Sequence, residues 1–175
     1  MTTPKDLQKF IDQAKKIEKG HQLDLSSGED LSIAIMNLIG IEEHMFFTSQ
    51  KLGDTKYIDV LNTAREMRKE LMKKIVKEGQ GEVWCTSKHL LSASMRLMEV
   101  GTKSLTKGDQ KEANDYFINS FDLYNLFWGL NLGLVDNVET HHDASLSKKE
   151  QPLPQKNLLG TISKTIGKIL DCCRE

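Results

Sequence analysis

The sequence Trp84-Cys85-Thr86-Ser87-Lys88-His89-Leu90-Leu91 lies near the middle of the chain, at the start of a stretch with helical periodicity. At roughly 100° per residue, a helix over residues 82–105 collects its large apolar side chains on one side. These core-facing residues are Trp84, Leu91, Met95, Met98 and Leu105. Lys88 falls inside this apolar arc. A separate stripe on the other side consists of Glu82, Cys85, His89, Ser92 and Arg96. The helix therefore has one core face, which includes a lysine, and one polar face.

Composition favours a single soluble domain of ordinary size. The chain has 175 residues, of which 38% are hydrophobic and 28% charged, which is enough for a sizeable core. A formal net charge of -1 gives no overall attraction to nucleic acid, so a nucleic-acid partner is not expected. No apolar run approaches the roughly 18 residues of a membrane-spanning helix, and the first residues lack the apolar core of a secretory signal. We expect a cytoplasmic protein with reduced thiols.

The helical part of the chain has few breaks. The three prolines lie at positions 4, 152 and 154, and the region between them is rich in Leu, Met, Lys and Glu without alternating β-branched runs. This predicts an all-α protein with four long helices over residues 29–52, 55–78, 82–105 and 109–134. Short glycine-containing turns between them imply antiparallel neighbours, and therefore an up-down bundle spanning residues 1–135. A short amphipathic helix is expected before it, built on Leu7, Phe10, Ile11, Ala14 and Ile17.

The C-terminal part of the chain differs in composition. Residues 136–157 are polar and contain two prolines, which indicates an exposed linker. Residues 158–175 then predict a tethered amphipathic helix. Its apolar stripe consists of Leu158, Leu159, Ile162, Ile166, Ile169 and Leu170, beside Lys164 and Lys168. We expect this helix to dock on the bundle or on a partner protein. Peripheral contact with an anionic membrane surface is the weaker alternative, since each basic residue contributes only about 1 kcal/mol.

One hairpin carries a spacing of small and large residues that resembles the tetratricopeptide pattern. The residues are Leu97, Gly101, Ala113, Phe117 and Ser120. The resemblance covers one hairpin, and no second copy is visible in the sequence, whereas repeat arrays need about three units to bury a continuous core. We interpret the spacing as close packing of two helices and assign no family.

Four polar side chains occupy apolar helix faces at similar depth. Glu42, Arg68, Lys88 and Tyr124 lie within about 12 Å of one another along the bundle axis, counted from the glycine turns at ~1.5 Å per residue. One interpretation is structural: Glu42 and Arg68 form a buried ion pair that fixes helix register, or both reach outward to water. The other is functional: Arg68, Lys88 and Tyr124 line a small, net-positive pocket for a carboxylate or phosphate.

The polar stripe contains groups that bind metals. Glu82, Cys85 and His89 have i, i+3, i+7 spacing and point the same way, and a zinc site would take a fourth donor from Glu43 or His44. A Cys85–His89 pair that activates a thiolate is a further alternative. The paired Glu-x-x-His spacing of di-iron bundles is absent, which argues against an oxidase. We expect Cys85 to be exposed and reactive.

Two classes of function remain open from the sequence. The favoured one is a non-catalytic helical bundle that binds a protein partner, or a second copy of itself, through exposed helix faces or the C-terminal helix. The alternative is a small enzyme or ligand-binding protein that uses the layer around Arg68 and Lys88, with Tyr124 as a proton donor, or a metal-binding bundle. A cavity large enough for a metabolite would favour the second class, and a filled core the first.

Overall fold

The computed structural model describes residues 25–76 and 81–133, and this part of the chain is all-α, as predicted. Its four helices are α2 (Leu25–Leu52), α3 (Lys56–Ile75), α4 (Glu82–Thr106) and α5 (Gln110–Asn131). These bounds agree with the predicted ones to within about four residues, the uncertainty expected at helix ends. The predicted N-terminal helix, the linker at 136–157 and the C-terminal helix at 158–175 lie outside the described residues.

Glycine and aspartate side by side make two of the turns. Gly53 and Gly108 have positive φ angles of 64° and 87°, a region that glycine enters without steric penalty. The aspartate that follows each glycine then supports the next helix. Asp54 accepts a hydrogen bond from the backbone N–H of Lys56 at 3.0 Å, and Asp109 caps α5 by accepting from the backbone N–H of Glu112 at 2.9 Å. Each turn therefore reverses the chain and produces an antiparallel hairpin.

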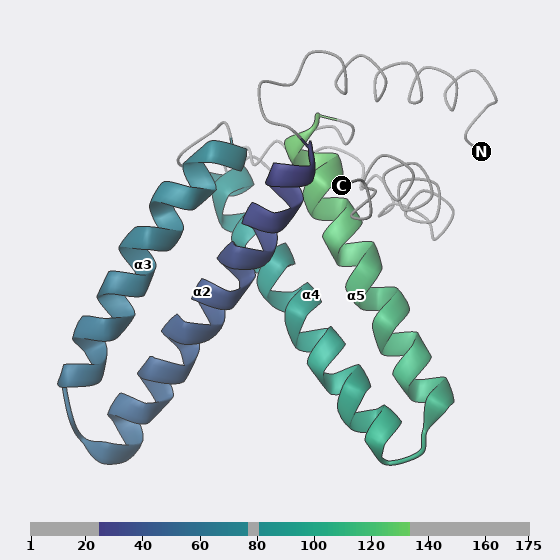
Figure 1. Cartoon of the computed structure of the whole chain (residues 1–175), viewed down its shortest axis with the longest axis horizontal. Helices are drawn as coiled ribbons and strands as arrows, with labels where there is room; N and C mark the ends of the chain where they lie inside the picture. Colours follow the sequence, from purple (N-terminus) through teal and green to yellow (C-terminus); the bar gives the residue numbers. More distant parts are fainter. Residues whose placement is uncertain (1–24, 77–80, 134–175) are drawn as a thin grey trace, which may run out of the picture.

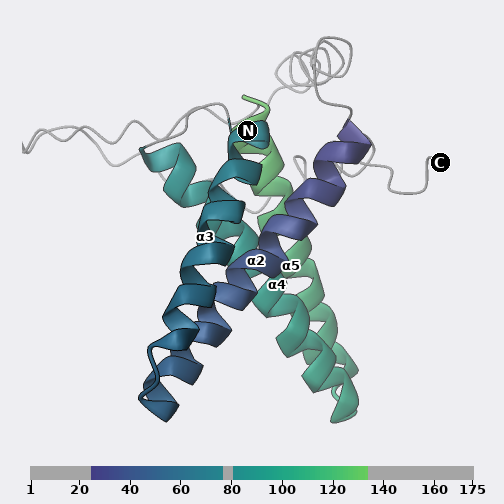
Figure 2. The same ribbon diagram turned by 60° about the vertical axis from the view of Figure 1, so that its left-hand side comes forward.

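The two hairpins cross each other. Within each hairpin the helices pack along most of their length, α2 against α3 and α4 against α5, whereas contact between the hairpins is small and mainly joins α2 to α4. Figures 1 and 2 show the hairpins meeting at the ends away from the glycine turns and diverging toward those turns. The four helices thus do not share one continuous seam. The up-down bundle predicted from the sequence is therefore not confirmed.

The buried core lies where the hairpins meet. All four helices contribute, and the core residues are Ile35, Met36, Met72, Ile75, Val76, Leu91, Phe127, Trp128 and Leu132. Phe127 and Trp128 stack edge to face with ring centroids 5.1 Å apart. Each fully buried large apolar side chain contributes about 1.5–3 kcal/mol, so this cluster is what holds the crossing together.

Toward the glycine turns, the predicted core face of α4 is partly wrong. Met98 and Leu105, both assigned to that face, are 48% and 49% exposed. Large apolar side chains of other helices are exposed too: Phe121 of α5 is 49% exposed, and Ile41 and Leu52 of α2 are 41% and 63% exposed. They are uncovered because the hairpins diverge and no facing helix reaches them.

Both hairpins have a seam with seven-residue spacing. In the first, the seam residues are Ile35, Glu42 and Ser49 on α2 and Leu61, Arg68 and Ile75 on α3. In the second, they are Ser87, Ser94 and Gly101 on α4 and Ala113, Ser120 and Phe127 on α5. A Cβ on Gly101 would lie 2.6 Å from the Phe117 ring and 3.2 Å from the carbonyl oxygen of Ala113. Close packing of α4 on α5 therefore accounts for the small-and-large spacing noted in the sequence.

Candidate functional site

Glu42 and Arg68 meet in the middle of the first hairpin. The Arg68 Nε donates to Oε1 of Glu42, and its Nη2 donates to Oε2 at 3.3 Å. Arg65 joins them, with its Nε 3.1 Å from the same Oε2. The side chain of Arg68 is 6% exposed and that of Glu42 12%, so the pair is inside the hairpin. One carboxylate is thus shared by two guanidinium groups.

The helix register explains this position. Glu42 is flanked on its seam by Ile35 and Ser49, and Arg68 by Leu61 and Ile75, each seven residues away, so the pair forms the middle layer of an antiparallel seam. Removing a carboxylate and a guanidinium from water is costly, and their hydrogen bonds offset that cost only in this register. Burial alone would raise the pKa of Glu42. The hydrogen bonds and charges of the two arginines outweigh burial and hold that pKa below its ordinary value of 4.5.

A cavity of about 330 Å³ lies next to the pair, between the first hairpin and α4. Its polar lining includes Glu42, Glu43, Arg65, Arg68, Lys88, His89 and Ser92, and its apolar lining Ile39, Phe46 and Leu61. Lys88 is half-buried, and among the residues that the structure describes it has no ion-pair or hydrogen-bond partner. Three of the four polar residues singled out in the sequence, Glu42, Arg68 and Lys88, therefore share one cavity.

Tyr124 lies elsewhere, contrary to the sequence-based prediction. Its hydroxyl is 2.7 Å from Oγ of Ser32, which itself donates to the carbonyl oxygen of Glu29, so the tyrosine hydroxyl is the donor in this pair. Its ring stacks on Phe127, and burial raises the pKa of the phenol. Equal depth brings four residues together only if four helices are aligned along one axis. Because the hairpins cross, α5 does not carry Tyr124 to this cavity, although Glu42, Arg68 and Lys88 reach it.

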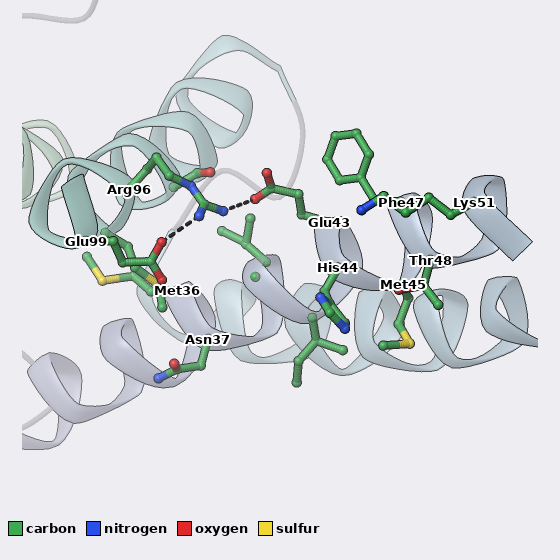
Figure 3. A pocket seen from close by; sticks show the side chains of 15 residues that line it. Met36, Asn37, Glu43, His44, Met45, Phe47, Thr48, Lys51, Arg96 and Glu99 are labelled. Carbon is green, nitrogen blue, oxygen red and sulfur yellow. Dashed lines mark hydrogen bonds and ion pairs between the residues drawn. The ribbon is translucent and has the colours of Figure 1, made fainter. Parts of the chain in front are cut away.

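A second, larger groove of about 560 Å³ opens between α2 and α4. Arg96 of α4 spans it by donating to Glu43 of α2 and to Glu99 one turn further along α4 (Figure 3). The rest of its lining is mixed. Six residues are apolar, namely Met36, Ile39, Ile41, Met45, Phe47 and Met95, and the others are Asn37, Gly40, His44, Thr48, Lys51 and Ser92. The gap between the hairpins thus holds two openings, a basic cavity and a larger groove of mixed apolar and polar lining.

The candidate metal ligands Glu82, Cys85 and His89 do not form a group. Among residues 25–76 and 81–133, no three His, Cys, Asp or Glu side chains are arranged to hold a metal ion. Residues seven apart on a helix are separated by about 10.5 Å along its axis, which is too far for one ion. Glu43, a possible fourth donor, is paired with Arg96 instead. Cys85 is exposed and free, in agreement with the expected exposure.

Sequence reasoning missed two residues of these sites. Arg65 precedes Arg68 by three residues, which places both on one side of α3 and within reach of one acidic group. Arg96 was assigned only to the polar stripe, although a stripe that faces a neighbouring helix can form ion pairs with it. In both cases the signal was present in the spacing, but the partner helix was not known.

The described part of the chain thus consists of two crossed helical hairpins, with a basic cavity and a larger groove between them. No protein-family model, curated protein or solved structure matches this chain. Within the described ranges, no helix combines the length and apolar character needed to cross a bilayer.

Proposed function

We propose that this protein is a non-catalytic binding protein and that the larger groove receives an amphipathic helix of a protein partner. The observation that supports the proposal is the set of large apolar side chains left uncovered on the diverging parts of the hairpins. Ile41 and Phe47 lie in the groove wall and are 41% and 52% exposed. Large apolar side chains that are exposed along a groove are typical of interaction sites.

The shape and chemistry of the groove suit a helix. Its walls are two helices that separate progressively, so a third helix laid between them would give each wall the neighbour that a bundle helix normally has. Arg96, Glu43 and Glu99 line the same groove and supply charged groups to a surface that also offers apolar contacts, a mixture found in many protein interfaces. A partner helix with apolar residues at i, i+3, i+4 and i+7 would fit these features.

Two finer parts of the proposal rest on sequence. The segment 158–175, with its apolar stripe, is proposed as a second contact surface for partners. The cytoplasm is proposed as the location, because the cysteines are not arranged as a disulfide framework.

The test is site-specific crosslinking in the producing cells. A photoreactive phenylalanine derivative replaces Phe47 in the full chain, and in a matched control it replaces Met67, an equally exposed apolar residue of α3 outside the groove. We expect one defined protein adduct from position 47 and none of that mass from position 67. Met95→Glu, on the groove wall, should remove most of the adduct.

Any other crosslinking result would assign a different occupant to the groove, or none. A product at twice the chain mass would assign the groove to a second copy, and an internal link to residues 158–175 would assign it to the C-terminal segment. Either result would overturn the partner helix. No adduct at position 47, or the same adducts from both positions, would overturn the groove as a docking site.

A further inference from the structure

We propose that the basic cavity beside Glu42 binds the phosphate group of a small organic phosphate. This inference is independent of the partner helix, because it rests on Arg65, Arg68 and Lys88, which line this opening and not the larger groove. The cavity volume of about 330 Å³ is at the small end of the range for ligand sites, which run from about 300 to 1,000 Å³.

The cavity has a local excess of positive charge. Three cationic side chains, Arg65, Arg68 and Lys88, face the cavity against the carboxylates of Glu42 and Glu43. Glu43 is already engaged by a cation outside the cavity lining. The lining therefore carries an excess of positive charge in a chain whose formal net charge is -1. An anion is the ligand that this distribution attracts.

The cavity also contains hydrogen-bond donors that have no described acceptor. Arg68 has used Nε and Nη2 on Glu42, and its Nη1 lies 3.5 Å from the sulfur of Met72. In the described residues, Arg65 makes one side-chain hydrogen bond, from Nε, so its terminal nitrogens remain available. Lys88 adds three N–H donors without a described acceptor. Donors from Arg65 and Lys88 without described acceptors, in one cavity, suit a group with three acceptor oxygens, which is what a phosphate monoester offers.

Phosphate fits this cavity better than carboxylate because it has more acceptors. A phosphate monoester offers three acceptor oxygens and a carboxylate two, so a phosphate can accept from Arg65 and Lys88 together. Phe46, Ile39 and Leu61 line the same cavity and provide an apolar wall for the carbon part of the ligand. In this site Glu42 is a positioning residue: it holds the two guanidinium groups in place and does not contact the ligand.

The experiment uses the full chain and phenyl phosphate as the probe, with binding followed by isothermal titration and by the imidazole NMR signals of the histidines. We expect saturable binding of one phenyl phosphate per chain, a shift of the His89 signals, and weaker binding of inorganic phosphate and of benzoate. Lys88→Met keeps the aliphatic stem and removes the charge, and it should weaken binding of phenyl phosphate by at least about tenfold. Arg65→Gln should also weaken it.

The matched control is Lys111→Met, which removes an exposed lysine of α5 that lines neither opening. Its affinity should equal that of the wild type, and circular dichroism should show all three variants folded. Three results would overturn the proposal: no saturable binding, equal affinities of Lys88→Met and Lys111→Met, or benzoate bound as tightly as phenyl phosphate. None of them depends on the partner groove, so a failure here leaves the crosslinking result unaffected.

Discussion

In the first hairpin the middle layer of the seam holds Glu42 and Arg68, and in the second hairpin the equivalent layer holds Ser94 and Ser120. Both pairs are 26 residues apart in sequence, so the two hairpins have the same antiparallel register. The serines are bonded reciprocally: Ser94 Oγ donates to the carbonyl oxygen of Ser120 at 2.8 Å, and Ser120 Oγ donates to that of Ser94 at 2.7 Å. One layer is charged and bordered by a cavity, and the other is neutral and closed.

The difference shows how one register supports two kinds of hairpin. Serine and glycine on α4 let α5 approach until there is no room for a side chain at Gly101. The long side chains of Glu42 and Arg68 instead fill the first seam, and Arg65 beside them keeps its terminal nitrogens available toward the neighbouring opening. The second hairpin is therefore specialised for close packing, and the first for holding charge.

Breaking the charged layer has the largest expected effect. Glu42→Leu leaves the guanidinium of Arg68 buried without its carboxylate, which should lower the free energy of unfolding by about 3–5 kcal/mol. Arg68→Met should cost less, because Glu42 keeps Arg65 as a partner. The double variant should cost much less than the sum of the two, since both desolvation penalties disappear. Urea unfolding of all four proteins gives the coupling energy. Additive effects would show that the two side chains do not stabilise each other.

Acid should weaken the interaction of Glu42 with the arginines, with a smaller effect on stability than Glu42→Leu. Because the pKa of Glu42 is held below 4.5 in the folded protein, its contribution is complete above about pH 4.5. That contribution is lost as the pH falls through the lower folded-state value. The urea midpoint of the wild type should therefore fall more steeply below pH 4.5 than that of the Glu42→Leu, Arg68→Met double variant. Parallel curves for the two proteins would contradict this. Both proteins contain all the other carboxylates, so the contributions of those groups to the pH dependence cancel in the comparison.

Filling the closest approach in the second hairpin should have a moderate effect. Gly101→Val places new carbon atoms against the Phe117 ring and the Ala113 carbonyl, and overpacking of this kind typically costs about 1–3 kcal/mol. Gly40→Val is the matched control, because a Cβ at Gly40 meets nothing within 4 Å. Thermal unfolding should show a clearly lower midpoint for Gly101→Val than for Gly40→Val. Equal midpoints would mean that α4 and α5 separate without penalty.

Removing the neutral layer should have a smaller effect than removing the charged one. Ser94→Ala or Ser120→Ala deletes one hydrogen bond to a helix carbonyl that is already bonded within its own helix, at an expected cost of about 1 kcal/mol each. Neither change leaves a buried charge. The comparison fails if either serine variant is destabilised as much as Glu42→Leu in the same urea titration.

Cys85 lies outside both seams and should be nearly neutral. Its side chain is exposed, so Cys85→Ser should change the free energy of unfolding by less than about 0.5 kcal/mol. The thiol should react with a maleimide without denaturant, and mass spectrometry with peptide mapping would locate the label. Protection of Cys85 in the native full chain would indicate that another segment or a partner covers this side of α4.

The sequence predicted the local structure well because its signals are local. Glycine turns fixed the hairpin ends, and the positions of Glu42 and Arg68 at the centres of apolar faces were sufficient to pair them. Periodicity does not specify the angle at which two hairpins cross, so Tyr124 was assigned to the wrong neighbours and Met98 to the core. Counting apolar residues alone also overlooked Ser87 and Ser94, whose seven-residue spacing with Gly101 was a readable signal of close packing.

The bridge from Arg96 to Glu43 has a mechanical consequence. Its two side chains are 51% and 43% exposed, and exposed ion pairs contribute only about 0–1 kcal/mol, close to thermal energy. Such a pair also weakens as ionic strength rises. The joint between the hairpins is therefore stiff at the apolar crossing and compliant toward the glycine turns. Because salt weakens this ion pair, a higher ionic strength should make the groove easier to widen, and the proposed partner helix would meet little resistance from the pair.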